Sequence, residues 1–309
     1  ATRAVPGTYC WGEDLYKKGV RPFSEVVEGR MTVKEFLAQM TDEEVAHLLG
    51  GQPNTGVANT FGWGNMPEYG IPNCMTAGLR IAPECGVTTT AWPCATLLAA
   101  TWNPNVVYQV GAAGGKEVKE NNIAAWLTPA LNIHRSPLCG RNFEYYSEDP
   151  LLAGVLAGAM VKGIQSQGVA ATVKHFALNN KETDRKHSDS RVSERAAREI
   201  YLKAFEYVIK GAKPWAVMSS YNIINGCYAS ENKELLEDIL RDEWGFDGMV
   251  TTDWWTLGEH YKEVKAGNDM KMACGDPKRL KEAMDQGLLT RQDLEHCAER
   301  VLNLILKLD

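Results

Sequence analysis

Asp253 is the residue of this sequence whose surroundings most strongly suggest chemistry. It ends the apolar, β-branched run Met249-Val250-Thr251-Thr252, which predicts a short buried strand. A carboxylate at the carboxyl end of such a strand stands where a (β/α) barrel places its reacting groups. The next two residues, Trp254 and Trp255, offer flat apolar faces on which a sugar ring can lie. Alternatively, Asp253 only caps a helix that begins near Trp255, and the local sequence does not decide between the two.

Charged and hydrogen-bonding residues also follow three other predicted strands. Because the carboxyl ends of barrel strands meet on one face, we expect these side chains to converge there. Such a face suits a polyhydroxylated ligand, since each hydroxyl needs a donor or an acceptor and charged partners form the stronger hydrogen bonds. The residues concerned are Arg141, Lys174, His175 and Tyr221.

Each of these residues also has a purely structural explanation. Lys174 and His175 could be a lysine paired with a carboxylate and a hydrogen-bonded core histidine. Arg141 and Glu144, three positions apart, could form an ordinary ion pair of little net value. His187, in a charged loop, could belong to a metal site or a proton relay, but no third ligand is spaced to match, so we predict no metal.

Composition restricts the class of protein. The 309 residues are 44% hydrophobic and 23% charged, as in ordinary globular proteins. A net charge of −6 argues against a nucleic-acid or membrane partner, and no apolar run approaches the roughly 18 residues of a membrane span. The eight cysteines contain no Cys-x-x-Cys pair. We predict them to be small buried side chains in a reducing compartment, which favours a cytoplasmic over a secreted protein.

Strand and helix patterns alternate along most of the chain, as they do in α/β folds. Seven or eight strands within about 250 residues favour a TIM-type (β/α)8-like barrel, with an irregular or incomplete first part. We predict an irregular N-terminal arm or linker at 1–30, the barrel at 31–309, and mostly loop at 51–95. Strands are predicted near 72–77, 96–102, 124–133, 169–176, 215–221, 248–252 and 269–273, and helices at 105–120, 150–167, 193–211, 231–244, 255–267, 276–286 and 290–308.

Several segments together resemble glycoside hydrolase family 3, which includes β-glucosidases, β-xylosidases and β-N-acetylglucosaminidases. The resemblance runs from about residue 40 to the end of the sequence, and the motifs occur in the family's order. They are Gly140-Arg141-Asn142-Phe143-Glu144, Ser147-Glu148-Asp149-Pro150, Lys174-His175-Phe176, Met218-Ser219-Ser220-Tyr221-Asn222, Trp244-Gly245-Phe246-Asp247-Gly248, Thr252-Asp253-Trp254 and Ala266-Gly267-Asn268-Asp269.

The resemblance implies a retaining β-glycosidase that hydrolyses terminal non-reducing β-D-glucosyl residues of a β-glucoside or oligosaccharide. Asp253 would be the nucleophile that forms a covalent glycosyl-enzyme intermediate. No metal or organic cofactor is implied. The residues implied to hold the sugar or to orient the nucleophile are Arg141, Lys174, His175, Tyr221 and Trp254.

Two features depart from the family's pattern. The family usually carries an Asp-Gly-Pro segment after its first barrel strand, whereas here Met75-Thr76-Ala77 runs directly into Gly78. The sequence also stops after the barrel, while the family's general acid usually comes from a following α/β sandwich domain. We therefore expect an isolated barrel to be impaired, with a face that such a domain or a second copy would cover.

Two other functions stay open at this point. The first is a non-catalytic sugar-binding or scaffold barrel, which the two departures favour. The second is a β-N-acetylglucosaminidase-like enzyme that uses the loop residue His187 as its acid.

Overall fold

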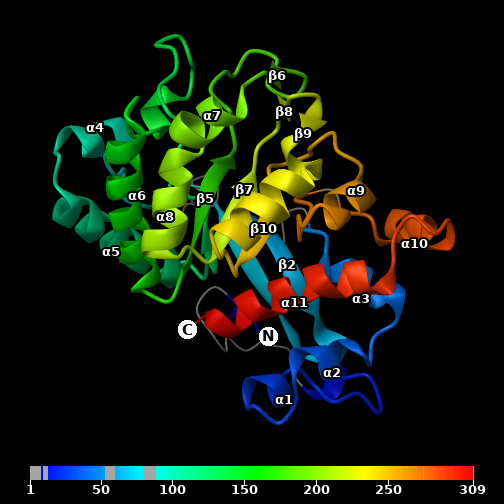
Figure 1. Cartoon of the computed structure of the whole chain (residues 1–309). Coiled ribbons are helices and arrows are strands. Elements are labelled where there is room, and N and C mark those ends of the chain that lie inside the picture. Colours follow the sequence, from blue (N-terminus) through cyan, green and yellow to red (C-terminus); the bar gives the residue numbers. More distant parts are fainter. Residues whose placement is uncertain (1–7, 10–12, 53–59, 79–87, 274, 309) are drawn as a thin grey trace.

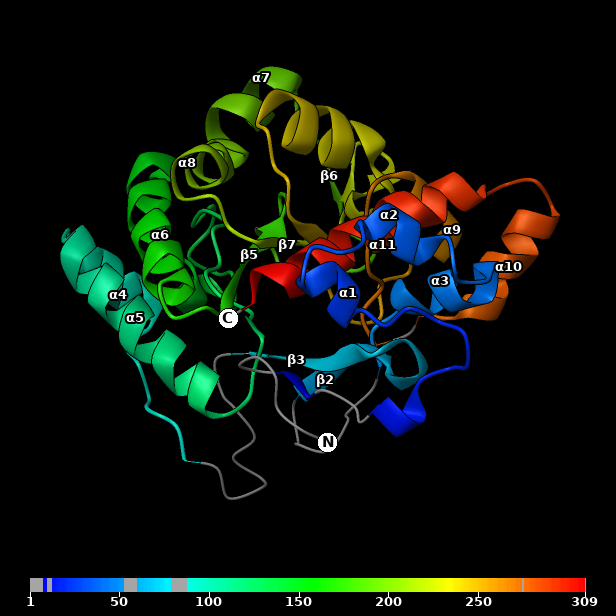
Figure 2. The same cartoon turned by 90° about the horizontal axis from the view of Figure 1, so that it is seen from below.

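The computed structural model describes residues 8–9, 13–52, 60–78, 88–273 and 275–308 of the chain (Figure 1). A curled sheet lies at the centre, and helices cover its outer side (Figures 1 and 2). Strands β3 and β5 are buried at every position. This is expected of strands that lie between a barrel interior and a layer of helices.

The central sheet is mainly parallel. Its strands pair in the order β3-β4-β5-β7-β10, and every one of these pairs is parallel. Strands β1 and β2 both pair with β3 in the antiparallel sense, so the first part of the sheet departs from a regular βα repeat. The strands are β1 Thr8–Tyr9, β2 Thr60–Met66, β3 Ile71–Ala77, β4 Ala125–Trp126, β5 Ala170–Phe176, β7 Ala216–Ser219 and β10 Met249–Thr252.

Single β-bridges close the sheet into a barrel. The segment 270–271 bridges in parallel to β10 on one side and to Gly50 on the other, and Gln52 bridges to β2 in the antiparallel sense. The seam is tight at Gly50, where an added Cβ would lie 2.9 Å from the Cα of Gly275. The predicted TIM-type barrel with an irregular first part is therefore confirmed.

Helices surround the barrel. Helices α5, α6 and α8 lie side by side on one flank, and α11 packs against α2, α3 and α9. The predicted start of α6 is confirmed, because Asp149 accepts a hydrogen bond from the Leu151 amide at 2.8 Å and Pro150 opens the first turn. The helices are α1 Ser24–Val27, α2 Val33–Leu37, α3 Asp42–Leu48, α4 Ala95–Ala100, α5 Pro104–Glu120, α6 Pro150–Gln165, α7 Glu194–Ala196, α8 Lys203–Ala212, η7 Glu234–Glu243, α9 His260–Lys265, α10 Pro277–Asp285 and α11 Arg291–Lys307.

Four predictions of secondary structure are wrong. The strand predicted near 269–273 is present only as single bridges at Met270 and Lys271, and the helix predicted at 255–267 begins only at His260. The run at 96–102, predicted as a strand, forms helix α4, in which Leu98 and Ala99 are buried while Leu97 is exposed. Short apolar runs do not distinguish a strand from a buried helix. Part of the segment predicted mostly as loop forms β2, whose glycines at 62 and 64 lower its apparent strand propensity.

The described part of residues 1–30 packs against the rest of the chain. Phe23 and Val26 belong to the same apolar cluster as residues of α2, α3 and α11. The amide of Phe23 donates a 2.9 Å hydrogen bond to the carbonyl of Tyr69. The proposed division into an arm and a barrel at residue 30 stays a prediction.

The prediction that the cysteine side chains are buried is correct for only some of them. Cys74 and Cys297 are buried, whereas Cys94 is exposed and Cys139 and Cys227 are half-buried. The other three, at positions 10, 85 and 274, lie outside the described residues. In the described part of the chain, none of the helices has the length and the apolar character needed to cross a membrane.

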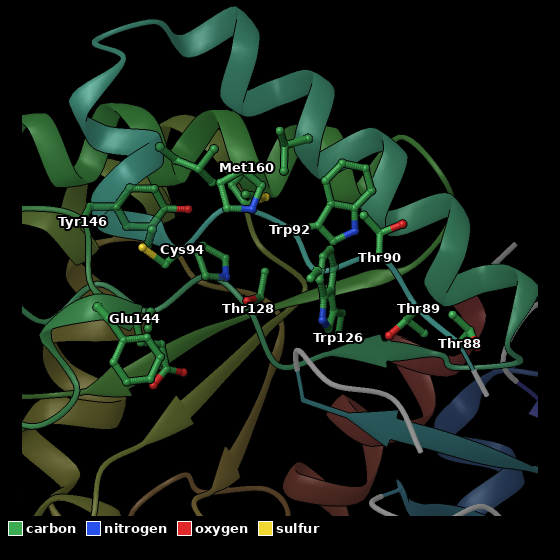
Figure 3. Close-up of a pocket in the computed structure, with 18 residues that line it drawn as sticks. Thr88, Thr89, Thr90, Trp92, Cys94, Trp126, Thr128, Glu144, Tyr146 and Met160 are labelled. Carbon is green, nitrogen blue, oxygen red and sulfur yellow. The ribbon is translucent and has the colours of Figure 1, made fainter. Parts of the chain in front are cut away.

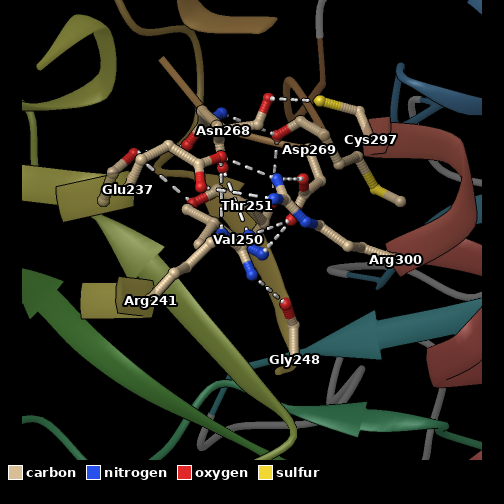
Figure 4. Close-up of polar contacts among 12 residues, drawn as sticks. Glu237, Arg241, Gly248, Val250, Thr251, Asn268, Asp269, Cys297 and Arg300 are labelled. Carbon is tan, nitrogen blue, oxygen red and sulfur yellow. Dashed lines mark hydrogen bonds and ion pairs between the residues drawn. The ribbon is translucent and has the colours of Figure 1, made fainter. Parts of the chain in front are cut away.

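A buried network of charges fastens β10 to η7 and α11 (Figure 4). The fully buried Asp269 side chain accepts hydrogen bonds from the Val250 amide at 2.7 Å, from Arg241 at 2.7 Å and from Arg300 at 3.1 Å. Arg300 also donates to Glu237 at 2.9 Å. A buried charge is stable only when it is paired, so Asp269 must keep both arginines beside it. Because Asp269 also accepts from the Val250 amide, this network holds β10 in place.

Replacing Asp269 by asparagine should lower the free energy of unfolding by about 3–5 kcal/mol, because Arg241 and Arg300 would lose their buried carboxylate. Urea unfolding followed by circular dichroism measures this. The matched control is Asp247→Asn, since Asp247 is 79% exposed and pairs with Lys307 on the surface. That change should cost less than about 0.5 kcal/mol. Similar losses in the two variants would contradict the assigned role.

Candidate active site

Asp253 directly follows β10, at the carboxyl ends of the parallel strands. Its amide donates to the Ser219 carbonyl at 3.1 Å, and its Oδ1 accepts a 2.7 Å hydrogen bond from the Trp254 amide. Its Oδ2 has no hydrogen-bond partner among the described residues. Helix α9 begins at His260 and has Glu259 as its N-cap, so the alternative that Asp253 caps this helix is wrong.

His175 lies beside Asp253. Its Nε2 is 3.8 Å from the Oδ2 of Asp253, and both side chains are buried. Its Nδ1 is 3.0 Å from the Tyr145 hydroxyl, and Asn179 donates to the same hydroxyl oxygen at 3.4 Å. A phenolic oxygen has two lone pairs, so it can accept from Asn179 and still either donate to Nδ1 of His175 or accept from it. When Tyr145 donates to Nδ1, the ring hydrogen of the neutral His175 sits on Nε2, on the side of Asp253.

Burial controls the protonation of both groups. It lowers the pKa of His175 well below its usual range, and the nearby cations, Arg141 first, lower it further, so the ring is neutral. Burial also raises the pKa of Asp253, while the backbone amide of the next residue, the cations Lys174 and Arg141 and the Tyr221 hydroxyl lower it. Asp253 is thus a poorly solvated carboxyl group whose charged form depends on cationic neighbours.

Glu144 joins two of the predicted site cations. Its Oε1 is 2.8 Å from Lys174 Nζ, and its Oε2 is 2.6 Å from Arg141 Nη2. Only 9% of the Glu144 side chain is exposed, and 8% of the Lys174 side chain. The Arg141–Glu144 pair is therefore no ordinary surface ion pair, although its spacing of three residues allowed that interpretation.

Two cations cover the ring of Tyr221. The guanidinium of Arg185 lies 4.5 Å from the ring centroid, and Lys186 Nζ lies 5.0 Å from it. Burial and the neighbouring Asp253 raise the pKa of Tyr221, so its hydroxyl keeps its proton and can donate it. Lys186 also donates to the Trp255 carbonyl at 2.9 Å, which ties the loop after β5 to the loop after β10.

Trp254 and Trp255 differ in their surroundings. The ring of Trp254 is half-buried and meets Phe61 of β2 edge to face, with the centroids 5.1 Å apart. Trp255 is 52% exposed, and its ring centroid lies 6.2 Å from that of Phe61. Aromatic contacts from the antiparallel strand β2 therefore position the tryptophan that follows Asp253.

A cavity of about 690 Å³ opens beside Glu144 (Figure 3). Its walls come from residues 88–95, the end of β4, and helices α5 and α6, and Trp92, Trp126 and Tyr146 give it an aromatic lining. Of the side chains in the cluster around Asp253, only Glu144 lines this cavity. The cavity therefore adjoins the cluster around Asp253 without containing its other members.

His187 is an exposed loop residue. Its Nδ1 is 2.8 Å from Asp184 Oδ1, and about two thirds of each side chain is exposed, 65% and 66%. Within the described residues, no group of three histidine, cysteine or acidic side chains could hold a metal ion. The position where Asp-Gly-Pro is missing, after Ala77, borders residues 79–87, which lie outside the described residues.

A barrel with a buried carboxyl group among cations at the carboxyl ends of its strands has the form of an enzyme active site, and comparison with known proteins gives the family. Residues 82–304 match the family model described as "Glycosyl hydrolase family 3 N terminal domain". The chain belongs to glycosyl hydrolase family 3.

Relatives with known names are similar over most of this chain. Beta-glucosidase A of Butyrivibrio fibrisolvens is 63% identical over 279 residues, which is 89% of this chain and 34% of that protein. Exo-alpha-(1->6)-L-arabinopyranosidase of Bifidobacterium longum is 43% identical over 282 residues, which is 87% of this chain and 36% of that protein. The chain thus spans about a third of the length of the curated relatives it matches.

Solved structures share the fold. Beta-glucosidase 3B from Thermotoga neapolitana, in complex with glucose, superposes with a TM-score of 0.86 at 43% identity. The match covers 90% of this chain and 43% of that chain. Beta-glucosidase from Paenibacillus barengoltzii superposes with a TM-score of 0.87 at 37% identity, over 99% of this chain and 36% of that chain.

The structure gathers the predicted residues around Asp253, but sequence reasoning missed several of their partners. Asn132 holds the backbone of His175 on both sides, through its Oδ1 at 2.8 Å and its Nδ2 at 2.9 Å. Tyr145 fixes the ring of His175. The only sequence signal for such partners was the spacing of Arg141 and Glu144, because the other contacts join residues far apart in the chain.

Asp253→Asn should make the protein more resistant to urea at pH 7.5. Burial raises the folded-state pKa of Asp253 above its unfolded value. The ionised group therefore costs stability above that pKa, and the cost disappears as the pH falls through it. The advantage of the asparagine variant should accordingly shrink toward pH 4, which urea midpoints at several pH values would reveal. A variant less stable than wild type at pH 7.5 would contradict this reading of the site.

Proposed function

We propose that this barrel is a retaining β-glycosidase that releases terminal non-reducing β-D-glucosyl residues through a covalent intermediate on Asp253. The observation that carries the proposal is the placement of Asp253. Its buried Oδ2 lacks a hydrogen-bond partner among the described residues and lies 3.8 Å from the neutral His175. Arg141 and Lys174 are close enough to lower its pKa. A carboxylate of this kind is poised to attack an electrophilic carbon.

The proposed chemistry has two steps. In the first, Asp253 attacks the anomeric carbon, and the glycosidic carbon–oxygen bond breaks as the leaving oxygen takes a proton from an acid. In the second, water attacks the same carbon, gives one proton to the conjugate base of that acid, and frees the carboxylate of Asp253. Arg141, Lys174 and His175 would hold the sugar hydroxyls by hydrogen bonds that strengthen in the oxocarbenium-like transition state.

Tyr221 and Trp254 would complete the sugar site. The protonated hydroxyl of Tyr221 would donate to Asp253 and keep the attacking oxygen oriented. The half-buried ring of Trp254 would offer an apolar face to the sugar. The names of the relatives support a glucosyl substrate only in part, since one is an arabinopyranosidase.

We propose that the acid step limits this barrel when it acts alone. Retaining glycosidases use a second carboxylic acid, and the contacts that the structure describes for Asp253 include none. An acid from another part of the enzyme, such as a second domain packed on this face, would supply it. Without it, cleavage of ordinary glycosides should be about 10²–10⁴-fold slower.

Labelling with a 2-deoxy-2-fluoro-β-glucoside that bears a dinitrophenyl leaving group tests the nucleophile directly. The leaving group needs little protonation, so the missing acid step does not obscure the result. Intact-protein mass should rise by one fluoroglucosyl unit, and peptide mapping should place the unit on Asp253.

The control for labelling is Asp253→Asn, which keeps the shape of the side chain but removes the nucleophile. It should give no adduct. The surface variant Asp247→Asn should label like wild type, because Asp247 is exposed. A folded wild-type protein that gains no mass would overturn the proposal and favour a non-catalytic sugar-binding or scaffold barrel.

His187 is the second candidate for the acid, in a β-N-acetylglucosaminidase-like enzyme. The observation that favours it is the anchoring of its neighbour Lys186 to the Trp255 carbonyl at 2.9 Å, which keeps the loop close to the residues after Asp253. His187→Ala should then slow cleavage of an N-acetylglucosaminide with a poor leaving group by about 10²–10⁴-fold and spare the dinitrophenyl glycoside. If wild type and His187→Ala cleave the substrate with the poor leaving group at equal rates, His187 is not the acid.

A further inference from the structure

We propose that Glu144 is a positioning residue that holds Arg141 and Lys174 side by side at the sugar site. The inference rests on the proposed function, because those two cations are the ones expected to bind sugar hydroxyls. Glu144 itself would not contact the reacting atoms. It would act through the two cations that it joins.

Both carboxylate oxygens of Glu144 are used in this contact. Oε1 accepts from Lys174 at 2.8 Å, and Oε2 accepts from Arg141 through Nη2 at 2.6 Å and through Nε at 2.8 Å. Burial opposes ionisation of Glu144, but Lys174 and Arg141 outweigh it and lower the pKa of the carboxyl group. Glu144 is therefore charged at neutral pH and shared by two cations.

Two enclosed cations without this carboxylate would repel each other. Only 8% of the Lys174 side chain and 22% of the Arg141 side chain are exposed, so water screens the pair weakly. A carboxylate between them turns the repulsion into two attractions and fixes the direction of each side chain. Their remaining hydrogens stay available for hydroxyl groups of a ligand.

The backbone around Glu144 is fixed independently of any ligand. Glu144 ends the short helix η4, Asn142–Glu144. The carbonyls of Asn142 and Tyr145 both accept from Thr96, at 2.8 Å each, and both lie within hydrogen-bond distance of His134 Nε2, at 2.8 and 3.0 Å. Contacts on each side of Glu144 thus hold in place the backbone that carries its side chain.

Glu144 also lines the cavity shown in Figure 3. A shortened side chain at this position would leave room that neighbouring side chains could enter. Glu144→Gln avoids this, because it keeps the shape and removes only the charge. Glu144→Asp keeps the charge but shortens the reach, so it cannot hold both cations at their present distances.

The chain contains a matched control for the loss of such a bridge. Glu206 also joins two cations, with Oε2 3.0 Å from Lys203 and Oε1 2.8 Å from Lys210. These side chains lie on the surface helix α8 and are between 27% and 49% exposed. Glu206→Gln therefore removes a carboxylate with the same connections, in a place where solvent replaces it.

The first measurement is the kinetics of labelling by the fluoroglucoside from pH 6 to pH 10. Glu144→Gln should reduce the second-order labelling constant by about 10- to 100-fold, the loss expected for a charge-assisted contact, and mainly by weakening the binding step. The fall of the rate at alkaline pH should begin at lower pH, since Glu144→Gln leaves Arg141 and Lys174 side by side without the carboxylate that they share. Glu144→Asp should weaken binding and keep the wild-type pH profile. Glu206→Gln should match wild type in both respects.

The second measurement does not depend on catalysis. Competitive acetylation with acetic anhydride across the same pH range, read by peptide mass, should show Lys174 reacting at lower pH in Glu144→Gln than in wild type. Unchanged acetylation or unchanged labelling in a folded Glu144→Gln would overturn the inference. If that variant does not fold, wild-type labelling kinetics in Glu144→Asp would overturn it.

The two measurements also separate this inference from the proposed function. If wild type labels and Glu144→Gln labels equally well, only the positioning role is removed. If wild type does not label, the proposed function and the positioning role are removed together. A shift in acetylation alone would then show that the contact is only a structural ion pair.

Discussion

Charges buried inside a closed barrel must find partners within the protein, and this requirement organises the whole structure. Asp269 meets it with two arginines and a backbone amide. Glu263 meets it with Lys271, at 2.7 Å, in a pair that is almost fully enclosed. Asp253 meets it only in part, since its Oδ1 accepts from the Trp254 amide whereas its Oδ2 has no hydrogen-bond partner among the described residues. A protein tolerates such a group mainly where a ligand or a reaction makes use of it.

The satisfied charges hold the unsatisfied one in place. Lys271 lies in the segment that closes the barrel, and besides Glu263 it donates to the Gly258 carbonyl at 2.8 Å and to the Thr256 hydroxyl at 3.0 Å. These hydrogen bonds therefore hold residues 254–259, which directly follow Asp253, against the segment that closes the barrel. On the other side, Asp269 accepts from the amide of Val250, within the strand that ends at Asp253. Stability and the proposed chemistry thus depend on the same framework.

The sequence was sufficient for the parts of the fold that depend on local pattern. The apolar run of β5, the cap at Asp149 and the long amphipathic helices follow from residues close together in the chain. It was insufficient where distant segments decide the outcome. Strand β2 depends on its pairing with β3, and the run at 95–100 becomes helix α4, whose buried face lies beside η4 and α6. On the other side of the barrel seam, Gly50 and Gln52 bridge as single residues, which leave no periodic signal.

The candidate site shows the same division. Residues at strand ends could be predicted, because the geometry of a barrel brings the ends of all strands together. Their supporting partners could not, since Asn132 and His175 are 43 positions apart, and Glu144 and Lys174 are separated by helix α6. These partners decide what the predicted residues are chemically. A neutral His175 with its hydrogen on Nε2 can donate to Asp253 or to a hydroxyl, whereas a charged one would add a third cation beside Arg141 and Lys174. Burial disfavours that state, so the positive charge of the site comes from its arginine and lysine side chains, two of which Glu144 joins.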